Sequence, residues 1–259
     1  HILIIGPLLI WLIPSLPFGK DAVDWAQIKS GLHYGLPLAM MELSNVALWY
    51  IDRFMMKVLI DDFAVIGIYS IGFALATYID QLINTALSQA LTPVTTRVFA
   101  TEGPAAVRAV KQRVMRPLIF ICFALSTGLI MAGKDFLTIL ASADKAAAAP
   151  VFIVAGVLFL MRAIVMAAAE GLLLHKRSKT VFVLTIVAAL VNAFANWILI
   201  PMFGMMGAVY ATGFSVIGLQ MLFFAYCPKE LKVWPQASVL IKAGLGALAC
   251  LSVAHHTEL

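Results

Sequence analysis

The sequence predicts an all-α, polytopic transmembrane helix bundle. The 259-residue chain is 63% hydrophobic and only 12% charged, with a mean hydropathy of +0.99, whereas soluble domains carry about 25% charged residues. Its apolar residues come in runs of about 17 to 25 residues, the length at which a helix crosses the hydrocarbon core of a bilayer. No run alternates as a membrane β-strand does, so helices are the structure that satisfies the backbone in lipid.

Eight apolar segments are expected to be these helices. They cover about residues 1–13, 31–52, 64–90, 117–133, 150–174, 181–201, 205–227 and 238–254. Because the first begins in mid-run, we expect the natural protein to extend upstream of it. Pro14 and Pro17 are expected to end it before an interfacial linker, and Pro201 is expected to end the sixth.

Lysine and arginine are divided unequally between alternate loops. One set holds Lys20, Lys29, Arg97, Arg108, Lys111, Arg113, Arg116, Lys176, Arg177, Lys179, Lys229, Lys232 and Lys242, and the opposite set only Arg53, Lys57, Lys134 and Lys145. The positive-inside rule predicts that the richer set is cytoplasmic. The basic residues form no helix face interleaved with stacking aromatics, so the net charge of +5 does not indicate a nucleic-acid partner.

Four ionisable side chains lie well inside the predicted spans, away from the ends. They are Glu42, Asp80, Arg162 and Glu170. A charge near the bilayer centre costs at least about 2.5 to 3.5 kcal/mol on insertion scales, so each is expected to face the bundle interior or a wet cavity.

Glu42 begins one predicted polar stripe. Asn45, Trp49 and Arg53 follow it at offsets of three, seven and eleven residues, close to one helical face. Alternatively, Glu42 is protonated or paired, and Arg53 snorkels to the interface beside Asp52.

A second polar face occupies the next span. Thr77, Asp80, Gln81, Asn84 and Ser88 recur there at helical spacing. This density favours the lining of a cavity over hydrogen bonding between helices alone.

Arg162 is the only basic residue well inside a span, and an unpaired guanidinium is not tolerated there. Two roles remain open: a structural bridge to an acidic residue such as Glu42 or Asp80, or binding of an anionic group such as a phosphate. Asn192 and Asn196 mark a further polar face, which is either a cavity wall or a site of hydrogen bonding between helices.

No residue pattern predicts catalysis, a metal or a cofactor. The histidines and cysteines show no ligand or redox spacing, and the chain has no nucleophile elbow and no phosphate loop of the ATPase type.

Three stretches carry a resemblance to a known family. They are SGLHYGLPLAMMELSNVALWYIDRFMM, VIGIYSIGFALATYIDQLINTALSQALTPV and VNAFANWILIPMFGMMGAVYATGFS, and they cover most of residues 30–227. The order of a Gly-Leu-Pro helix, Asp-Arg at its end and Gly-Ile-Tyr-Ser resembles the polysaccharide-transporter branch, which includes O-antigen translocases, of the multidrug, oligosaccharidyl-lipid and polysaccharide exporter superfamily.

The resemblance implies a two-lobe exporter of which this chain holds the second lobe. The implied divisions are 1–13 as the truncated last helix of the N-terminal lobe, 14–29 as an interfacial linker, 30–228 as the C-terminal six-helix lobe, and 229–259 as a loop with an additional transmembrane helix. It also implies a flippase that moves an oligosaccharide on polyprenyl pyrophosphate across the membrane by alternating access. The implied partners are this lipid-linked oligosaccharide, membrane lipids, H⁺ or Na⁺ as a coupling ion, and the polymerase and ligase of the same pathway.

Under this resemblance, Arg162 and Arg53 are expected to neutralise the pyrophosphate, Asp80 and Asn84 to bind sugar hydroxyls, and Glu42 or Asp80 to couple ion entry. Two other functions stay open: a cation-coupled drug or metabolite antiporter, disfavoured by Arg162, and a membrane-embedded polymerase or glycosyltransferase, disfavoured by short outer loops without Asp-x-Asp. A purely structural membrane subunit is the third alternative.

Overall fold

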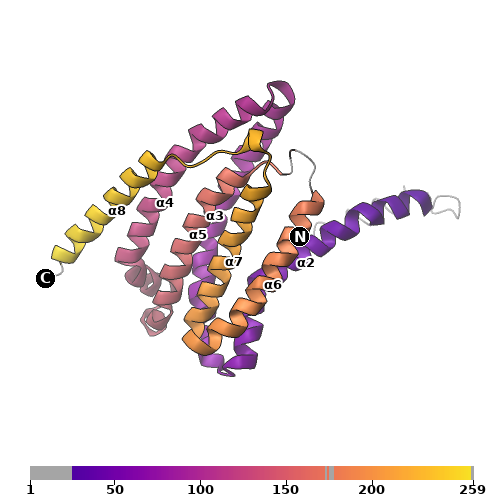
Figure 1. Ribbon diagram of the computed structural model, residues 1–259. Helices are drawn as coiled ribbons and strands as arrows, with labels where there is room; N and C mark the ends of the chain where they lie inside the picture. Colours follow the sequence, from indigo (N-terminus) through magenta and orange to yellow (C-terminus); the bar gives the residue numbers. More distant parts are fainter. Residues whose placement is uncertain (1–24, 173, 175–177, 258–259) are drawn as a thin grey trace, which may run out of the picture. The chain divides into compact units, whose positions relative to one another are not determined.

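The computed structural model describes residues 25–172, 174 and 178–257 (Figure 1). The chain divides into two compact units, residues 1–40 and 41–259. In the first unit, the described residues form the beginning of helix α2. The predicted span 1–13 and most of the linker 14–29 lie outside the described residues.

The described residues form helices and no strand, which confirms the all-α prediction. The elements are α2 (Trp25–Leu59), α3 (Phe63–Thr101), α4 (Pro104–Ala141), the 3₁₀ helix η3 (Ala143–Ala148), α5 (Ala149–Ala169), α6 (Ser178–Phe203), α7 (Met205–Tyr226), the 3₁₀ helix η4 (Lys229–Leu231) and α8 (Ala237–Thr257). Among them, α3, α4, η3 with α5, α6, α7 and α8 provide six helices long and apolar enough to cross a membrane. The chain is therefore a multi-pass membrane protein. α2 contains the predicted span 31–52 but is not one of these six.

The region between the third and fourth predicted spans differs from expectation, because residues 91–101 and 104–116 are helical and not a loop. α3 has 39 residues, or about 58 Å at 1.5 Å per residue, against a hydrocarbon core of about 30 Å. The helices continue beyond the apolar stretches because the Arg, Gln and Ala residues in this region favour helix. The chain reverses at Gly103, whose φ of 84° suits glycine, and Pro104 begins α4.

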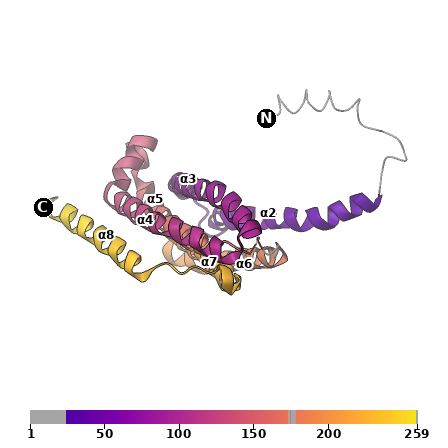
Figure 2. The ribbon, with the colours of Figure 1, turned by 90° about the horizontal axis from the view of Figure 1, so that it is seen from above.

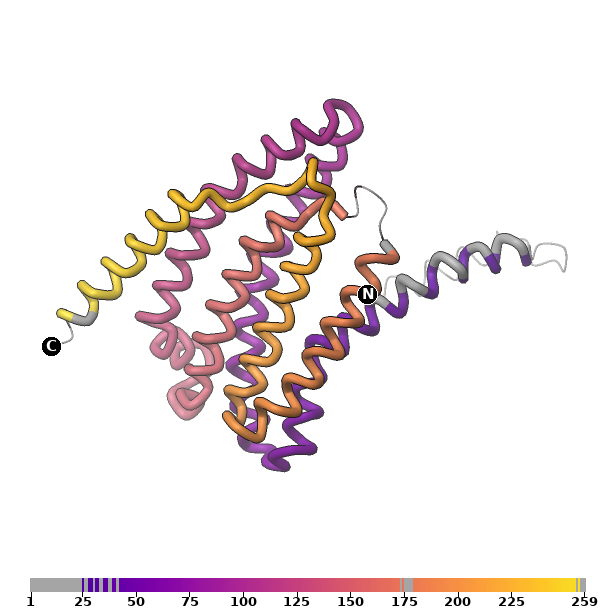
Figure 3. Tube along the Cα trace, in the orientation of Figure 1, coloured from indigo at the N-terminus to yellow at the C-terminus, as the bar shows by residue number. Residues whose placement is uncertain are grey.

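Within the second unit, α5 is the central helix. It packs against α3, α4 and α7, while α6 packs against α7 and α8 against α4 (Figures 1 and 3). Seen from above, α8 lies on the outer side of α4 (Figure 2). Small residues on α5, including Ala155, Ala163 and Ala167, are buried and allow the neighbouring backbones to approach closely.

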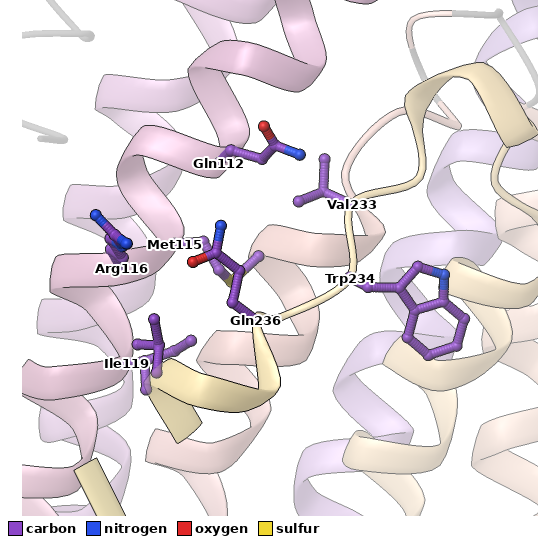
Figure 4. Close-up of a pocket in the computed structure, with 8 residues that line it drawn as sticks. Gln112, Met115, Arg116, Ile119, Val233, Trp234 and Gln236 are labelled. Carbon is purple, nitrogen blue, oxygen red and sulfur yellow. The ribbon is translucent and has the colours of Figure 1, made fainter. Parts of the chain in front are cut away.

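A crossing segment connects η4 to α8 and lies against α4. Figure 4 shows Gln112, Met115 and Arg116 of α4 opposite Gln236, around a cavity of about 10 Å³, which is room for a single water molecule. Trp234 points away from α4 and packs edge-on against Phe224 with ring centroids 4.6 Å apart. This contact fixes the segment at the end of α7. The cavity beside α4 is too small for a ligand.

The turn between α6 and α7 is tighter than the sequence predicts. Pro201 lies in the last turn of α6, and the helix ends two residues later at Phe203. Gly204, with a φ of 57°, then reverses the chain. A Cβ atom on Gly207 would lie only 2.1 Å from the carbonyl oxygen of Leu199. Gly207 is therefore required by the close approach of the two helices.

We expect Gly207→Ala to destabilise the protein by about 1 to 3 kcal/mol, the usual cost of overpacking. Thermal unfolding of the purified protein in detergent measures the effect. Gly218→Ala on the same helix is the matched control, because nothing lies within 4 Å of its added Cβ. Equal unfolding temperatures for the two variants would contradict the close approach.

Candidate functional site

A buried ion pair joins the middle of two membrane helices. Arg162 on α5 donates from Nη2 to both carboxylate oxygens of Asp80 on α3, at 2.8 and 2.7 Å, and from Nε to Oδ1 at 3.2 Å. The two side chains are only 11% and 6% exposed. Asn84, one turn along α3, donates from Nδ2 to the same carboxylate at 2.6 Å. Bidentate, charge-assisted contacts of this kind are among the strongest in proteins.

The pair is covered on one side by aromatic rings. The guanidinium carbon of Arg162 lies 5.6 Å from the ring centroid of Trp49, and Trp49 packs edge-on against Phe73 and Phe159. Arg162 makes no hydrogen bond through Nη1 to any residue that the structure describes. It therefore keeps donor capacity beyond its contact with Asp80.

Of the two acidic partners considered for Arg162, the structure pairs it with Asp80. Glu42 is exposed on α2, and Asn45 is half-buried there. Thr77 donates to the carbonyl oxygen of Phe73 at 2.8 Å, so its hydroxyl is satisfied within α3.

Beyond Asp80, α3 presents an exposed polar face. Its members are Gln81, Ser88, Gln89, Thr92 and Thr96, all exposed in this chain. A membrane helix does not present such a face to lipid without cost, so this face requires water or another protein surface.

Arg53 belongs to a neighbouring cluster near the C-terminal end of α2, and its Nη1 donates to the carbonyl oxygen of Trp49 at 3.3 Å. Asp52 is fully buried and accepts hydrogen bonds from the Tyr69 hydroxyl and, at 2.7 Å, from the backbone amide of Arg53. The guanidinium of Arg53 lies 3.5 Å from Asp52 and above the rings of Tyr50, Tyr69 and Phe73. Arg53 is thus fixed by an acidic and aromatic environment and does not simply reach for the interface.

Glu170 lies just beyond α5, so the prediction that places it inside a span is wrong. α5 ends at Ala169 and not near residue 174, because Glu170 adopts extended backbone angles. Its carboxylate accepts hydrogen bonds from Thr92 at 2.9 Å and Thr95 at 3.4 Å. Burial raises the pKa of this carboxyl above its ordinary value, and the hydrogen bond from Thr92 opposes that rise.

Lys111 is not the loop charge that the sequence analysis predicts. It is 1% exposed on α4, and its ammonium donates to the carbonyl oxygens of Ala168 at 2.9 Å, Glu170 at 2.6 Å and Leu231 at 2.9 Å. Two of these carbonyls are at the C-terminal end of α5, where a cation also interacts favourably with the helix dipole. Lys111 therefore joins α4, the end of α5 and η4.

The two asparagines of α6 lie inside the α6–α7 interface. Asn192 donates to the Thr212 hydroxyl at 3.2 Å, and Asn196 donates to the carbonyl and side-chain oxygens of Asn192 at 3.0 and 3.1 Å. Both residues are 0% exposed. These are the contacts of hydrogen bonding between helices.

The predicted site residues thus lie in several places, and one group comes together. Asp80, Asn84 and Arg162 are in direct contact, whereas Arg53, Glu170 and the α6 asparagines each belong to another cluster. The buried partners Asp52, Tyr69 and Lys111 were absent from the predicted site. For Lys111 a signal exists: it lies four residues from both Val107 and Met115, on the buried face of α4.

Comparison with known protein families matches residues 8–150, more than half of the chain, to the polysaccharide biosynthesis protein family. The chain belongs to this family. The match begins before the described residues and includes α2, α3 and α4, with Asp80 and Asn84, while Arg162 lies beyond it. Comparisons with curated proteins and with solved structures found no match.

Membership gives this polysaccharide biosynthesis protein a role in polysaccharide biosynthesis, and its helices make it a multi-pass membrane protein. Within residues 25–172, 174 and 178–257, no group of His, Cys, Asp or Glu side chains is arranged to hold a metal ion.

Proposed function

We propose that the protein is a flippase for a polyprenyl-pyrophosphate-linked oligosaccharide, working by alternating access in the bacterial inner membrane. The observation that carries this proposal is the Asp80–Arg162 pair in a membrane bundle of a polysaccharide biosynthesis family. A buried pair of this kind is weak evidence for stability, because desolvation offsets much of its attraction. A role in substrate binding or in conformational change accounts for the presence of the pair.

The chemistry of the pair fits an exchange of partners. Two anionic oxygens of a pyrophosphate can accept the paired N–H groups of a guanidinium, as the two oxygens of a carboxylate do, so the pyrophosphate competes with Asp80 for Arg162. Release of Asp80 leaves a carboxylate that takes up H⁺ or Na⁺, which couples the two events.

The exposed polar face of α3 supports this proposal, since Gln81, Ser88 and Gln89 carry groups that bind sugar hydroxyls. In the proposed arrangement, the described bundle is the second lobe, and a first lobe faces α3 across an aqueous passage. Glycan polymerase and ligase of the same pathway would then receive the exported intermediate.

The test uses the full-length protein in cells that lack their own copy, with Arg162→Lys as the variant. Lysine keeps the charge and the ion pair but loses the bidentate fork. We expect surface polysaccharide to fall at least about tenfold at normal membrane levels of the protein, with lipid-linked oligosaccharide accumulating on the cytoplasmic side.

Arg116→Lys, the same change at an exposed position of α4, is the control and should export normally. Normal export by Arg162→Lys would remove the bidentate guanidinium from the mechanism.

A further inference from the structure

A second cavity lies at the end of the bundle where α3, α5 and α7 terminate. Its volume is about 680 Å³, within the range of small-molecule sites. The wall is mostly apolar and includes Phe99, Met166, Leu174 and Phe223. Lys111 and its carbonyl partners lie directly behind Glu170, on the side toward η4.

Glu170 is the only ionisable side chain among the described residues that line this cavity. One carboxylate oxygen accepts from Thr92 and Thr95, and the other makes no hydrogen bond to a described residue. The nearby ammonium of Lys111 already serves three backbone carbonyls. A carboxylate oxygen is therefore available to a ligand.

The remaining polar groups of the wall are uncharged. Ser88, Thr92, Thr96 and Gln220 place hydroxyl and amide groups in the lining beside the carboxylate. No described basic side chain lines the cavity, so the described wall presents no cation to an anionic ligand. A cation attached to an apolar body matches it instead, because the aromatic rings of Phe99 and Phe223 also favour a cation.

We propose that this cavity binds an amphipathic primary amine, with its ammonium on Glu170 and its apolar body against Met166, Leu174 and Phe223. This site is distinct from the Asp80–Arg162 pair and does not depend on the flippase proposal. Two sources supply the chemistry: the ethanolamine headgroup of a phospholipid, or a soluble amine with an apolar chain.

The test measures binding of two fluorescent probes to the purified full-length protein in detergent. Both probes carry a dansyl group on an eight-carbon chain, and they differ only in ending with a primary amine or a hydroxyl. We expect the amine to bind at least about tenfold more tightly, as a charge-assisted hydrogen bond to a carboxylate would give. Equal affinities for the two probes would overturn the proposal.

Glu170→Gln is expected to abolish the preference for the amine. The substitution leaves the backbone carbonyl that holds Lys111 in place, so the turn should still fold. Glu102→Gln, at an exposed carboxylate outside the cavity, is the matched control and should keep the preference. A Glu170→Gln protein that still prefers the amine contradicts the assignment.

Ala100→Trp provides a second variant, because Ala100 is exposed on α3 and lines the cavity. Filling the cavity should lower the affinity for both probes at least about tenfold. Unchanged affinities would place the site elsewhere. Displacement of the amine probe by phosphatidylethanolamine but not by phosphatidylglycerol identifies a lipid source, and displacement by octylamine alone identifies a soluble one. If neither displaces it, the proposal fails.

Discussion

Replacing Lys111 by methionine is expected to lower the free energy of unfolding by about 3 kcal/mol. The substitution removes three charge-assisted hydrogen bonds, each worth about 1.5 to 3 kcal/mol, and returns part of this by no longer burying an ammonium. The carbonyl oxygens of Ala168, Glu170 and Leu231 lose their shared donor. Methionine fills nearly the same volume, so the loss comes from these acceptors and not from a cavity.

The substitution of Lys111 is also expected to loosen the structure locally. Because Lys111 holds the end of α5 to η4, we expect the turn at 170–172 and the segment before α8 to exchange amide hydrogens faster in the variant. Denaturant unfolding of the protein in detergent gives the free energy, and hydrogen exchange gives the location.

Lys134→Met is the matched control, since it makes the same substitution at an exposed position of the same helix. It should change stability by less than about 0.5 kcal/mol. If Lys111→Met is as stable as Lys134→Met, the three carbonyls have another donor in solution, and Lys111 is not what joins these elements.

Lys111 also shows where sequence reasoning was limited. Composition and the length of apolar runs suffice to predict a helical membrane bundle, because lipid permits few other structures. They do not say how far a helix continues past the apolar run, so residues 91–116 were predicted as loop. The positive-inside rule counts a lysine by its place along the chain and not by the helical face it occupies.

Only part of the candidate site was predicted, because the sequence does not show which residues of different helices are in contact. The cost of burying charge correctly singles out Asp80 and Arg162 as residues that need partners, but their spacing of 82 residues leaves the partner open. Glu42 was equally available by sequence, and only the packing of α3 against α5 selects Asp80. Asp52 enters the sequence analysis only as the neighbour of Arg53, because the sequence does not show its contact with Tyr69 from another helix.

The Asp80–Arg162 pair is expected to show strong coupling in a double-mutant cycle. Asp80→Asn and Arg162→Met should each cost about 3 kcal/mol or more, because each leaves the partner's charge buried without compensation. The double variant should be more stable than either single variant, since it buries no unpaired charge. Unfolding in detergent of the four proteins gives the coupling energy, which we expect to reach about 2 kcal/mol or more.

The same four proteins separate a structural bridge from a working site. If the pair serves only to hold α3 against α5, the double variant, with its stability recovered, should also recover polysaccharide export. If Arg162 binds the pyrophosphate, the double variant should reach normal membrane levels and still fail to export, because no guanidinium remains. Single-variant costs that simply add would show that the two side chains do not interact in the membrane, and the structural bridge and the exchange of partners would then both fall.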